Sequence, residues 1–443
     1  MTKNIVLTGI NVCLLLLFPG YCSGAEDADE VIPDAIHRYV NRAEPDFAWQ
    51  KGETLDTEAG RVHQLRVTSQ KWQGTVWNHA VEIYEPKEVA FPRHALLFVT
   101  GGSRPKAPDE DDLKMGLSLA KMCGARVVML HQVPNQPLLG GRKEDDLITE
   151  SWLKYLDTGD DSWPILFAMV KSAVKTMDAV QELSRAEWDE PIEHFVITGA
   201  SKRGWTSWLT PVADPRVIGT APIVIDVLNF RAQMQHQLNS WGQFSEQIID
   251  YTSKGLVKRP DEEESPREVA LRRMMDPFTY RQKLSLPKLL IVGTNDRYWV
   301  VDSMNLYWDD LVGNKYIRQV PNAGHGLDGG REGALTTLAV FFRSVAAGVE
   351  PPRISWKFSN GGRQLKLAME SDPVPARVRL WTVQSDDLDF RDDQWKSTEV
   401  DRNGGRPEGT VQIPETGHVA MFGELEFDFQ GLPWSLTTLV FRN

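Results

Sequence analysis

The chain has 443 residues, of which 41% are hydrophobic and 25% charged, a length that suggests two or three domains. This composition is typical of a globular protein with a large core and excludes the disordered and fibrous classes. The formal net charge of −12 argues against a nucleic-acid-binding surface, because phosphate recognition needs clustered Lys and Arg.

The N-terminus carries the pattern of an export signal. Lys3 is followed by an apolar run from Ile5 to Phe18, and small residues in YCSGAED precede an acidic stretch. These are the features of a secretory signal peptide, which we expect to span residues 1–24. A membrane anchor is the alternative, but the run is shorter than the roughly 20 residues of a spanning helix. We therefore expect a secreted or periplasmic protein without a stable membrane anchor after signal removal.

The cysteines and histidines indicate no metal or disulfide chemistry. Cys13 and Cys22 fall in the leader, so the mature chain would hold only Cys123 and no internal disulfide. Cys123 lies in an apolar pattern and is interpreted as a small buried hydrophobic residue rather than a nucleophile. No set of His and Cys stands at a metal-ligand spacing. We expect neither a metal nor another cofactor.

The middle of the chain alternates between strand and helix patterns. Residues 64–86 resemble an antiparallel hairpin at the edge of a sheet. Continuous apolar strands separated by helices are typical of a parallel sheet covered on both faces. We therefore predict an α/β fold with a doubly wound, mostly parallel sheet. Its strands are expected within 94–102, 125–130, 194–198, 216–225, 287–296 and 315–326, and its helices at 111–122, 162–183 and 333–348.

Two regions depart from this alternation. Residues 227–286 contain no convincing strand and are too long for an ordinary connection. We expect a helical cap insertion over the mouth of the sheet, with a solvated loop at 258–267 and with Trp241, Phe244 and Tyr251 available to line a pocket. From residue 351 to 443 short alternating segments are separated by Gly, Pro and Asp clusters. This pattern predicts a C-terminal β-sandwich domain, which leaves residues 25–350 as the catalytic domain.

The stretch HFVITGASKRGWTSWL, residues 194–209, predicts a nucleophile elbow. A short apolar strand ends at Thr198, Ser201 lies between Gly199 and Gly204, and an aromatic helical pattern follows. A serine on a sharp turn between strand and helix presents its hydroxyl to a pocket.

A serine nucleophile needs a base, and the base needs an acid that holds its tautomer. His325 lies in the glycine-flanked loop VPNAGHGLDGG, and Asp296 ends the segment LLIVGTND. The order Ser, Asp, His is that of α/β-hydrolases. Asp226, which ends the strand after the elbow, and Asp302 remain alternative acids.

Cleavage also requires hydrogen-bond donors for the oxyanion. The first is expected to be the backbone amide of Lys202, and the second to come from Gly102 or Ser103 in the loop VTGGSRP. We place Arg203, Trp205, Trp241 and Trp299 in the substrate site. Arg203 also has a structural interpretation, as the partner of a helix-packing carboxylate.

Several motifs resemble one known family. GASKRGWTSWL, GTNDRYWVVDS and PNAGHG, with the hairpin TSQKWQGTVWNH and the β-rich tail, are similar to the PhoPQ-activated pathogenicity-related protein family. The family resembles α/β-hydrolases of the prolyl oligopeptidase and esterase kind, and its members are mostly described as exported. The resemblance implies a secreted serine hydrolase with Ser201, Asp296 and His325 in the triad positions, and it implies no particular substrate.

The sequence thus favours an exported serine hydrolase that acts on an ester or peptide bond of a small molecule or peptide. One alternative is a non-catalytic binding or signalling protein on a hydrolase fold. The other is an esterase for uronate substrates, because glucuronoyl esterases also place a cation directly after the nucleophilic serine. The sequence indicates no oligomeric state.

Overall fold

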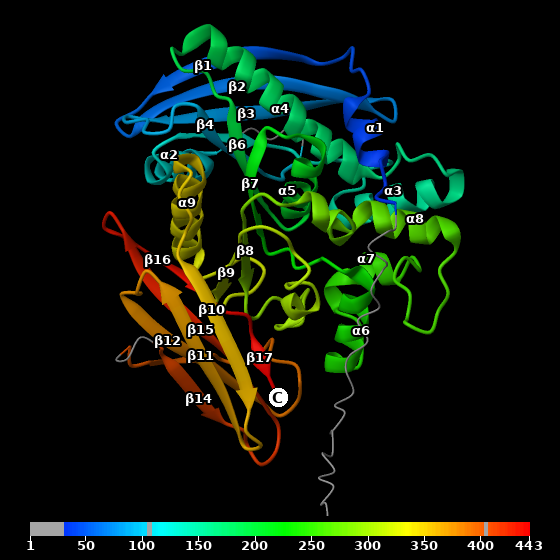
Figure 1. Cartoon of the computed structure of the whole chain (residues 1–443). Coiled ribbons are helices and arrows are strands. Elements are labelled where there is room, and N and C mark those ends of the chain that lie inside the picture. Colours follow the sequence, from blue (N-terminus) through cyan, green and yellow to red (C-terminus); the bar gives the residue numbers. More distant parts are fainter. Residues whose placement is uncertain (1–30, 104–108, 403–405) are drawn as a thin grey trace, which may run out of the picture. The chain divides into compact units, whose positions relative to one another are not determined.

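The computed structural model describes residues 31–103, 109–402 and 406–443, so the predicted signal peptide lies outside the described residues. Residues Pro33–Asn443 form one compact unit, in which a large sheet flanked by helices adjoins a smaller all-β region (Figure 1). In the part of the chain that the structure describes, no helix has the length and hydropathy of a membrane span.

The main sheet has nine strands in the order β1-β2-β3-β5-β4-β6-β7-β8-β9. Six of these strands, β4 to β9, run parallel to one another. They are mostly buried, as expected for apolar strands that are covered on both faces. The predicted doubly wound, mostly parallel sheet is confirmed. These strands are β4 (His94–Val99), β5 (Arg126–Leu130), β6 (His194–Ala200), β7 (Val217–Ile223), β8 (Lys288–Gly293) and β9 (Lys315–Val320).

An antiparallel extension completes one edge of this sheet. The predicted hairpin corresponds to β2 (Gly60–Trp72) and β3 (Thr75–Pro86), and β3 pairs antiparallel with β5. Outside β2 lies β1 (Ala48–Asp56), which is not among the predicted strands. Its residues are mostly polar and exposed, as befits an edge strand that must resist pairing with other chains.

Helices cover both faces of the sheet. α2 (Glu110–Cys123) packs against α9 (Arg331–Ala347), while α1 (Ala35–Asn41), α4 (Ile165–Glu187) and α5 (Lys202–Ala213) form a second group. α3 (Glu144–Thr158) is not among the predicted helices. Between β7 and β8 the chain forms helical elements without strands, as predicted for the insertion. They are α6 (Phe230–Trp241), η1 (Glu246–Ile248), α7 (Ile249–Thr252), α8 (Pro266–Met275) and η2 (Pro277–Lys283), and η3 (Ser303–Leu306) follows β8.

The C-terminal region forms two sheets, which fits the predicted β-sandwich. The first contains β10 (Arg353–Asn360), β11 (Gln364–Asp372) and β14 (Glu408–Gln412). The second contains β13 (Lys396–Glu399), β12 (Arg377–Ser385), β15 (His418–Phe429) and β16 (Leu432–Thr437), with β17 (Phe441–Arg442) paired to β15.

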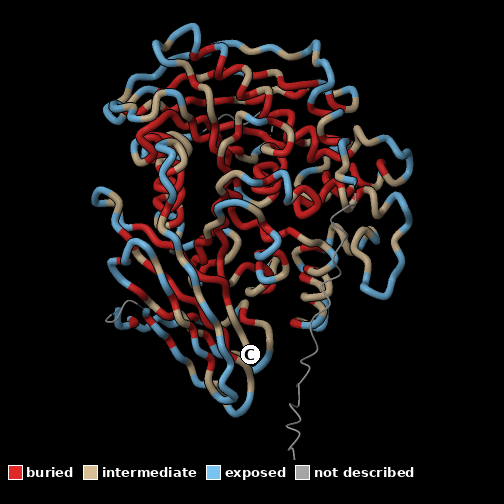
Figure 2. The backbone as a smooth tube through the Cα atoms, viewed as in Figure 1, coloured by how far each residue is buried: buried red, intermediate tan, exposed pale blue. Residues whose placement is uncertain are grey.

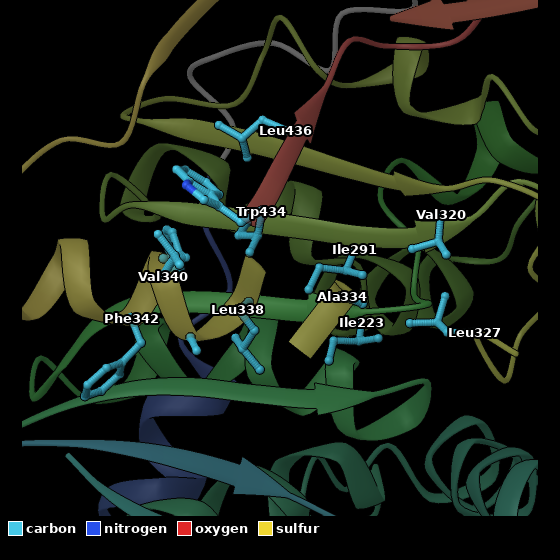
Figure 3. Close-up of a cluster of buried hydrophobic side chains, with 14 of the residues drawn as sticks. Ile223, Ile291, Val320, Leu327, Ala334, Leu338, Val340, Phe342, Trp434 and Leu436 are labelled. Carbon is cyan, nitrogen blue, oxygen red and sulfur yellow. The ribbon is translucent and has the colours of Figure 1, made fainter. Parts of the chain in front are cut away.

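One apolar core joins the main sheet to the C-terminal sheets through α9 (Figure 3). Leu338 and Phe342 of α9 are fully buried, and the same cluster contains Ile291 of β8 and Trp434 of β16. A helix that is buried around its circumference must be covered on more than one side. Buried residues accordingly continue from the main sheet through α9 into the C-terminal strands (Figure 2).

A buried ion pair crosses the same boundary. Arg318 of β9 donates to Glu424 of β15 over 2.6 Å, and their side chains are 10% and 5% exposed. Trp381 Nε1 also donates to Glu424 at 2.8 Å. Burial alone would raise the pKa of Glu424, but the charge of Arg318 and these hydrogen bonds outweigh it and lower that pKa. The pair therefore stabilises the junction only while Glu424 is ionised.

We predict that Glu424→Gln lowers the free energy of unfolding at neutral pH by about 3 kcal/mol, because removal of one partner leaves the other charge buried and unpaired. Urea unfolding would measure the loss. Glu426→Gln is the matched control: Glu426 pairs with Arg379 at 3.3 Å but is 26% exposed, so its loss should stay below about 1 kcal/mol.

The effect of Glu424→Gln should also depend on pH. A lowered folded-state pKa stabilises the fold above the ordinary glutamate pKa, and this stabilisation disappears as the pH falls through the folded value. The difference between wild type and variant should therefore shrink in acid. Equal losses in the two variants, or a difference that grows on acidification, would contradict this account of the junction.

Candidate active site

Ser201 occupies the turn between β6 and α5 in a strained backbone conformation. Its φ is 57° and its ψ −125°, a region that non-glycine residues rarely enter. The turn is held on both sides, because Ser201 N donates to Ile223 O at 2.8 Å and Trp205 N donates to Ser201 O at 3.0 Å. This is the geometry of a nucleophile elbow.

The two glycines of the elbow are required by close contacts. A Cβ on Gly199 would lie 2.7 Å from the carbonyl oxygen of Arg203. A Cβ on Gly204 would lie 2.6 Å from Ile225 Cγ2 and 2.8 Å from the carbonyl oxygen of Gly199. The glycine spacing therefore permits the first turn of α5 to pack directly on β6 and on the chain after β7.

His325 and Asp296 meet where the loops after β9 and β8 come together. His325 Nδ1 lies 2.8 Å from Asp296 Oδ2, and Asp296 Oδ1 accepts a hydrogen bond from Tyr298 N at 2.9 Å. Asp296 is only 3% exposed. The rings of Tyr298 and His325 lie 4.4 Å apart between centroids, so the imidazole is held from its face and from its Nδ1 edge. Ser201 and His325 line the same cavity.

Asp226, the first alternative acid, has different partners. It accepts hydrogen bonds from Ser303 Oγ at 2.7 Å and from Tyr307 Oη at 2.5 Å. Burial raises the pKa of Asp226 to about 6, although both hydroxyls act in the opposite direction. Asp226 is thus a buried structural anchor for the segment that follows Asp296.

Asp302, the second alternative acid, joins the cap to the C-terminus. It lies 2.6 Å from His236 Nε2 and 2.8 Å from Arg442 Nε. Burial alone would raise the pKa of Asp302, but His236 and Arg442 outweigh it and lower that pKa. Of the three carboxylates that the sequence offered, Asp296 is therefore the one bonded to His325.

Arg203 does not face the cavity. Its guanidinium forms a bidentate pair with Glu144, with both nitrogens 2.8 Å from the carboxylate, and its Nε donates to Val133 O at 2.5 Å. Burial alone would raise the pKa of Glu144, but Arg203, Gln136 and Lys202 outweigh it and lower that pKa to about 2. The assignment of Arg203 to substrate binding is wrong, because this cation pairs with a carboxylate of α3.

Lys202 lines the cavity, but its charge is balanced. Its Nζ lies 2.9 Å from Asp145 Oδ2, and Asp145 Oδ1 accepts a hydrogen bond from Tyr251 Oη at 3.0 Å. The sequence analysis did not identify Asp145 or Glu144. A signal was present, because the acidic run at 144–146 is typical of a helix N-terminus.

The candidate oxyanion donors follow two neighbouring strands, β6 and β4. Lys202 is the first residue of α5, and the loop that contains Gly102 and Ser103 follows β4, which pairs with β6. A Cβ on Gly101 would lie 2.6 Å from Arg203 Nη2, so this loop packs beside the elbow. Gly102 has a φ of 101° and its carbonyl accepts a hydrogen bond from Gln136 Nε2 at 3.3 Å.

The cavity beside Ser201 has a volume of about 160 Å³ and mostly apolar walls. Trp205, Trp299 and Tyr251 line it as predicted, whereas Trp241 does not. The ring of Trp241 instead lies under Arg391, 3.9 Å from the guanidinium carbon, so its assignment to substrate binding is wrong. The other apolar and aromatic residues of the lining include Trp152, Leu156, Ile225, Val227, Phe230, Met234, Ile248, Leu256, Val257, Leu271 and Tyr298.

Within residues 31–103, 109–402 and 406–443, no group of three or more His, Cys, Asp or Glu side chains is arranged to hold a metal ion. Cys123 is a free thiol buried in the core, and burial raises its pKa.

Solved structures of hydrolases share part of this architecture. Acetyl xylan esterase 1 from Thermoanaerobacterium sp. JW/SL YS485 aligns with a TM-score of 0.48 and 16% identity, covering 70% of this chain and 94% of the esterase. A glucuronoyl esterase from Solibacter usitatus aligns with a TM-score of 0.43 and 10% identity, covering 70% of this chain and 91% of that one. At these TM-scores the likeness supports no argument about activity.

Sequence comparison is more specific. Autocrine proliferation repressor protein A of Dictyostelium discoideum is 33% identical over 374 residues, which cover 80% of this chain and 74% of that protein. The family model for the PhoPQ-activated pathogenicity-related protein matches residues 36–391. This span includes the elbow, the hairpin, the cap and both loops that carry Asp296 and His325, and it confirms the resemblance drawn from the motifs. The chain therefore belongs to the PhoPQ-activated pathogenicity-related protein family.

Proposed function

We propose that this protein is an exported serine hydrolase that cleaves an ester or peptide bond through an acyl-enzyme. Ser201 is the nucleophile, His325 the general base and Asp296 the acid that orients it. The observation that carries the proposal is the 2.8 Å hydrogen bond between His325 and Asp296, in a site where His325 and Ser201 line one cavity. Export rests on the signal pattern in residues 1–24.

Each residue has a definite part in the reaction. His325 takes the proton of the Ser201 hydroxyl as its oxygen attacks the carbonyl carbon, and it then protonates the leaving group. Asp296 keeps the Nδ1 proton of His325 in place and stabilises the imidazolium. The amide of Lys202 and a donor from Gly102 or Ser103 stabilise the oxyanion, and each such donor typically contributes about 3 kcal/mol. Water then releases the acyl group by the same steps.

The charges of the cavity favour a neutral substrate. Each lysine and arginine of the cavity lining is paired within the protein: Lys202 with Asp145 at 2.9 Å, Arg231 and Arg272 with Glu264 at 2.9 and 3.1 Å, and Lys258 with Glu268 at 3.0 Å. These pairs leave little net attraction for a free carboxylate on the substrate.

The size and walls of the cavity point the same way. Its volume of about 160 Å³ is close to that of an engineered apolar cavity of about 150 Å³ that binds benzene. We therefore propose that the substrate places an uncharged, ring-sized apolar group beside the scissile bond.

A second candidate function is signalling without turnover. The relative with 33% identity is named an autocrine proliferation repressor protein, which supports a secreted signalling role on the same fold. The two functions are separable, since a purely signalling protein would lose nothing when Ser201 is replaced.

We predict that Ser201→Ala abolishes hydrolysis of small neutral acyl esters, with a fall in turnover of roughly 10⁶-fold or to the detection limit. Circular dichroism should show an unchanged fold. A variant that kept more than a few per cent of wild-type turnover would mean that another residue is the nucleophile.

The assignment of the acid predicts an asymmetry between two buried aspartates. Asp296→Asn should lower kcat by roughly 10⁴-fold, because the base loses the partner that fixes its tautomer. Asp226→Asn should cost less than about tenfold, since Asp226 bonds Ser303 and Tyr307 rather than His325 and a neutral amide can still accept. Steady-state kinetics on both variants decide the matter, and a more damaging Asp226→Asn would transfer the role to that residue.

The pairing of Lys202 and Arg203 within the protein predicts how variants of these residues act on acidic and on neutral substrates. Lys202→Met and Arg203→Met should reduce kcat/KM equally, within about threefold, for an acidic acyl ester and a neutral ester of the same size, because both cations are paired within the protein. A loss at least tenfold larger on the acidic substrates would instead assign that cation to substrate binding.

A further inference from the structure

Residues 386–395, the connection between β12 and β13, bring the C-terminal region to the loops of the candidate active site. We call this connection the brace loop. We propose that the brace loop holds the two catalytic loops in register, and that Asn295 and Asn322 are the positioning residues through which it acts. The inference rests on the proposed function, since it concerns the geometry of the Asp296–His325 pair.

Asn295, directly before Asp296, binds the brace loop. Its side-chain Nδ2 lies 3.4 Å from Phe390 O, 3.1 Å from Arg391 O and 2.8 Å from Asp393 O. The amide nitrogen of Asn295 is therefore surrounded by backbone carbonyl oxygens of the brace loop. An amide group with this many acceptors around it is fixed in orientation, and with it the backbone that carries Asp296.

Asn322, three residues before His325, binds Trp395, the last residue of the brace loop. Its Nδ2 donates to Trp395 O at 3.0 Å, and its Oδ1 accepts from Trp395 N at 2.6 Å. The side-chain amide of Asn322 thus pairs with the backbone of Trp395 in the way that backbone groups pair between two strands. The two catalytic loops are thus bonded to the same short segment, residues 390–395.

The catalytic loops are also tied to each other at the same place. Asn322 N donates to Thr294 Oγ1 at 2.9 Å, Thr294 Oγ1 donates to Asn295 Oδ1 at 2.8 Å, and Asn295 N donates to Ala323 O at 3.0 Å. A Cβ on Gly293 would lie 2.2 Å from Ala323 O, so only glycine permits this approach. A shift of the brace loop would therefore displace both Asp296 and His325.

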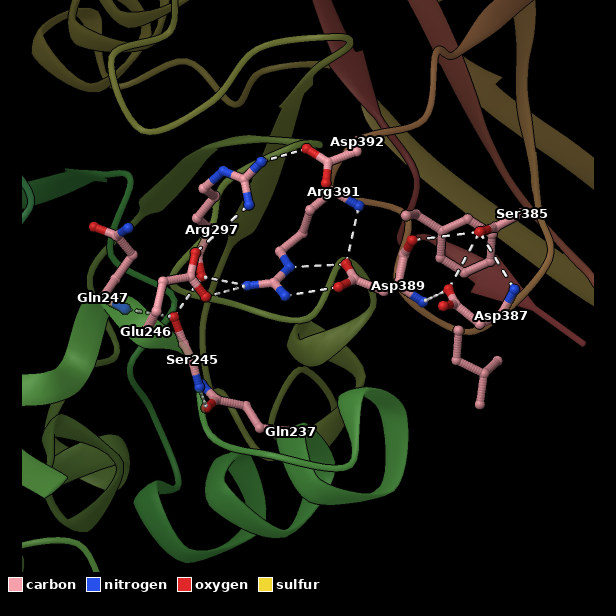
Figure 4. Close-up of polar contacts among 12 residues, drawn as sticks. Gln237, Ser245, Glu246, Gln247, Arg297, Ser385, Asp387, Asp389, Arg391 and Asp392 are labelled. Atoms are coloured by element: carbon pink, nitrogen blue, oxygen red, sulfur yellow. Dashed lines mark hydrogen bonds and ion pairs between the residues drawn. The ribbon is translucent and has the colours of Figure 1, made fainter.

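The brace loop is itself anchored. Phe390 and Trp395 are each 2% exposed and belong to an apolar cluster of the C-terminal sheet, against which Val301 of the hydrolase region packs. Arg391 binds Asp389 and reaches Glu246 of the cap at 3.0 Å, and Arg297 pairs with Asp392 (Figure 4). The brace loop thus contacts the C-terminal sheet, the cap and the loop after β8 that carries Asp296.

Small displacements of Asp296 or His325 should lower the reaction rate. Catalytic groups must be held within about 0.5 Å of the productive geometry, and a misplacement of about 1 Å can cost roughly 100-fold in rate. Asn295 and Asn322 lie one and three residues from the reacting pair, and their loss should reduce kcat with little effect on substrate binding.

Three variants of the full-length protein test the inference. Asn295→Ala and Asn322→Ala should each lower kcat at least tenfold on a neutral aryl ester, with KM within about twofold of wild type. Asn305→Ala is the matched control: Asn305 Nδ2 also bonds the C-terminal region, at Val440 O over 2.9 Å, and its own turn, at Asp302 O over 2.8 Å, but these bonds reach neither Asp296, His325 nor the brace loop. Its kcat should stay within about twofold of wild type, while all three variants shift the Tm by similar amounts.

An isosteric change gives an independent readout if the alanine variants fail to fold. Asn295→Asp keeps the side-chain volume but faces carbonyl oxygens with a carboxylate. Its kcat relative to wild type should rise as the pH falls and the introduced carboxyl becomes a donor. A purely structural defect would show no such recovery.

Equal falls of kcat in all three alanine variants, or falls that only track the Tm, would overturn the role of the brace loop. So would an Asn295→Asp ratio that does not change with pH. The proposed function fails by a different result, namely full esterase activity in Ser201→Ala, so the two failures are distinguishable.

Discussion

The hydrogen bond between His325 and Asp296, 2.8 Å long, joins two loops that follow neighbouring parallel strands. Because β8 and β9 pair in parallel, their carboxyl ends meet at one edge of the sheet, and Gly293 allows the loops to touch. The same edge receives Ser201 on the strained turn after β6. The cap, the cavity and the C-terminal contacts are all arranged around this meeting of chain segments.

The environment of the site is set by paired charges more than by free ones. The cations that follow Ser201 are bonded to Glu144 and Asp145 at the start of α3, and they therefore shape the elbow instead of displaying net charge. Aromatic residues from α3, α5, α6 and the loop after Asp296 supply the walls. Such a site combines a polar reacting edge with an apolar, neutral interior, which accounts for the substrate class proposed above.

The features that the sequence predicted well are those with local periodicity or a fixed order. The parallel strands, the strained turn at Ser201 and the pairing of Asp296 with His325 belong to this class. What it missed depends on distant contacts. β1 is too polar to resemble a strand, and the interpretation of Arg203 stayed open until α3 placed Glu144 beside it. Trp241, the last residue of α6, lies against Arg391 of the C-terminal region, a contact between distant parts of the chain. The contact between Asn295 and Phe390 spans 95 residues and leaves no periodic trace.

The most direct test of this account is covalent labelling of the folded wild-type protein with a fluorophosphonate, followed by peptide mapping by mass spectrometry. A nucleophile activated by His325 predicts one adduct, on Ser201. An adduct on another residue, or no adduct in a protein whose fold is intact, would contradict the claim that Ser201 is an activated nucleophile.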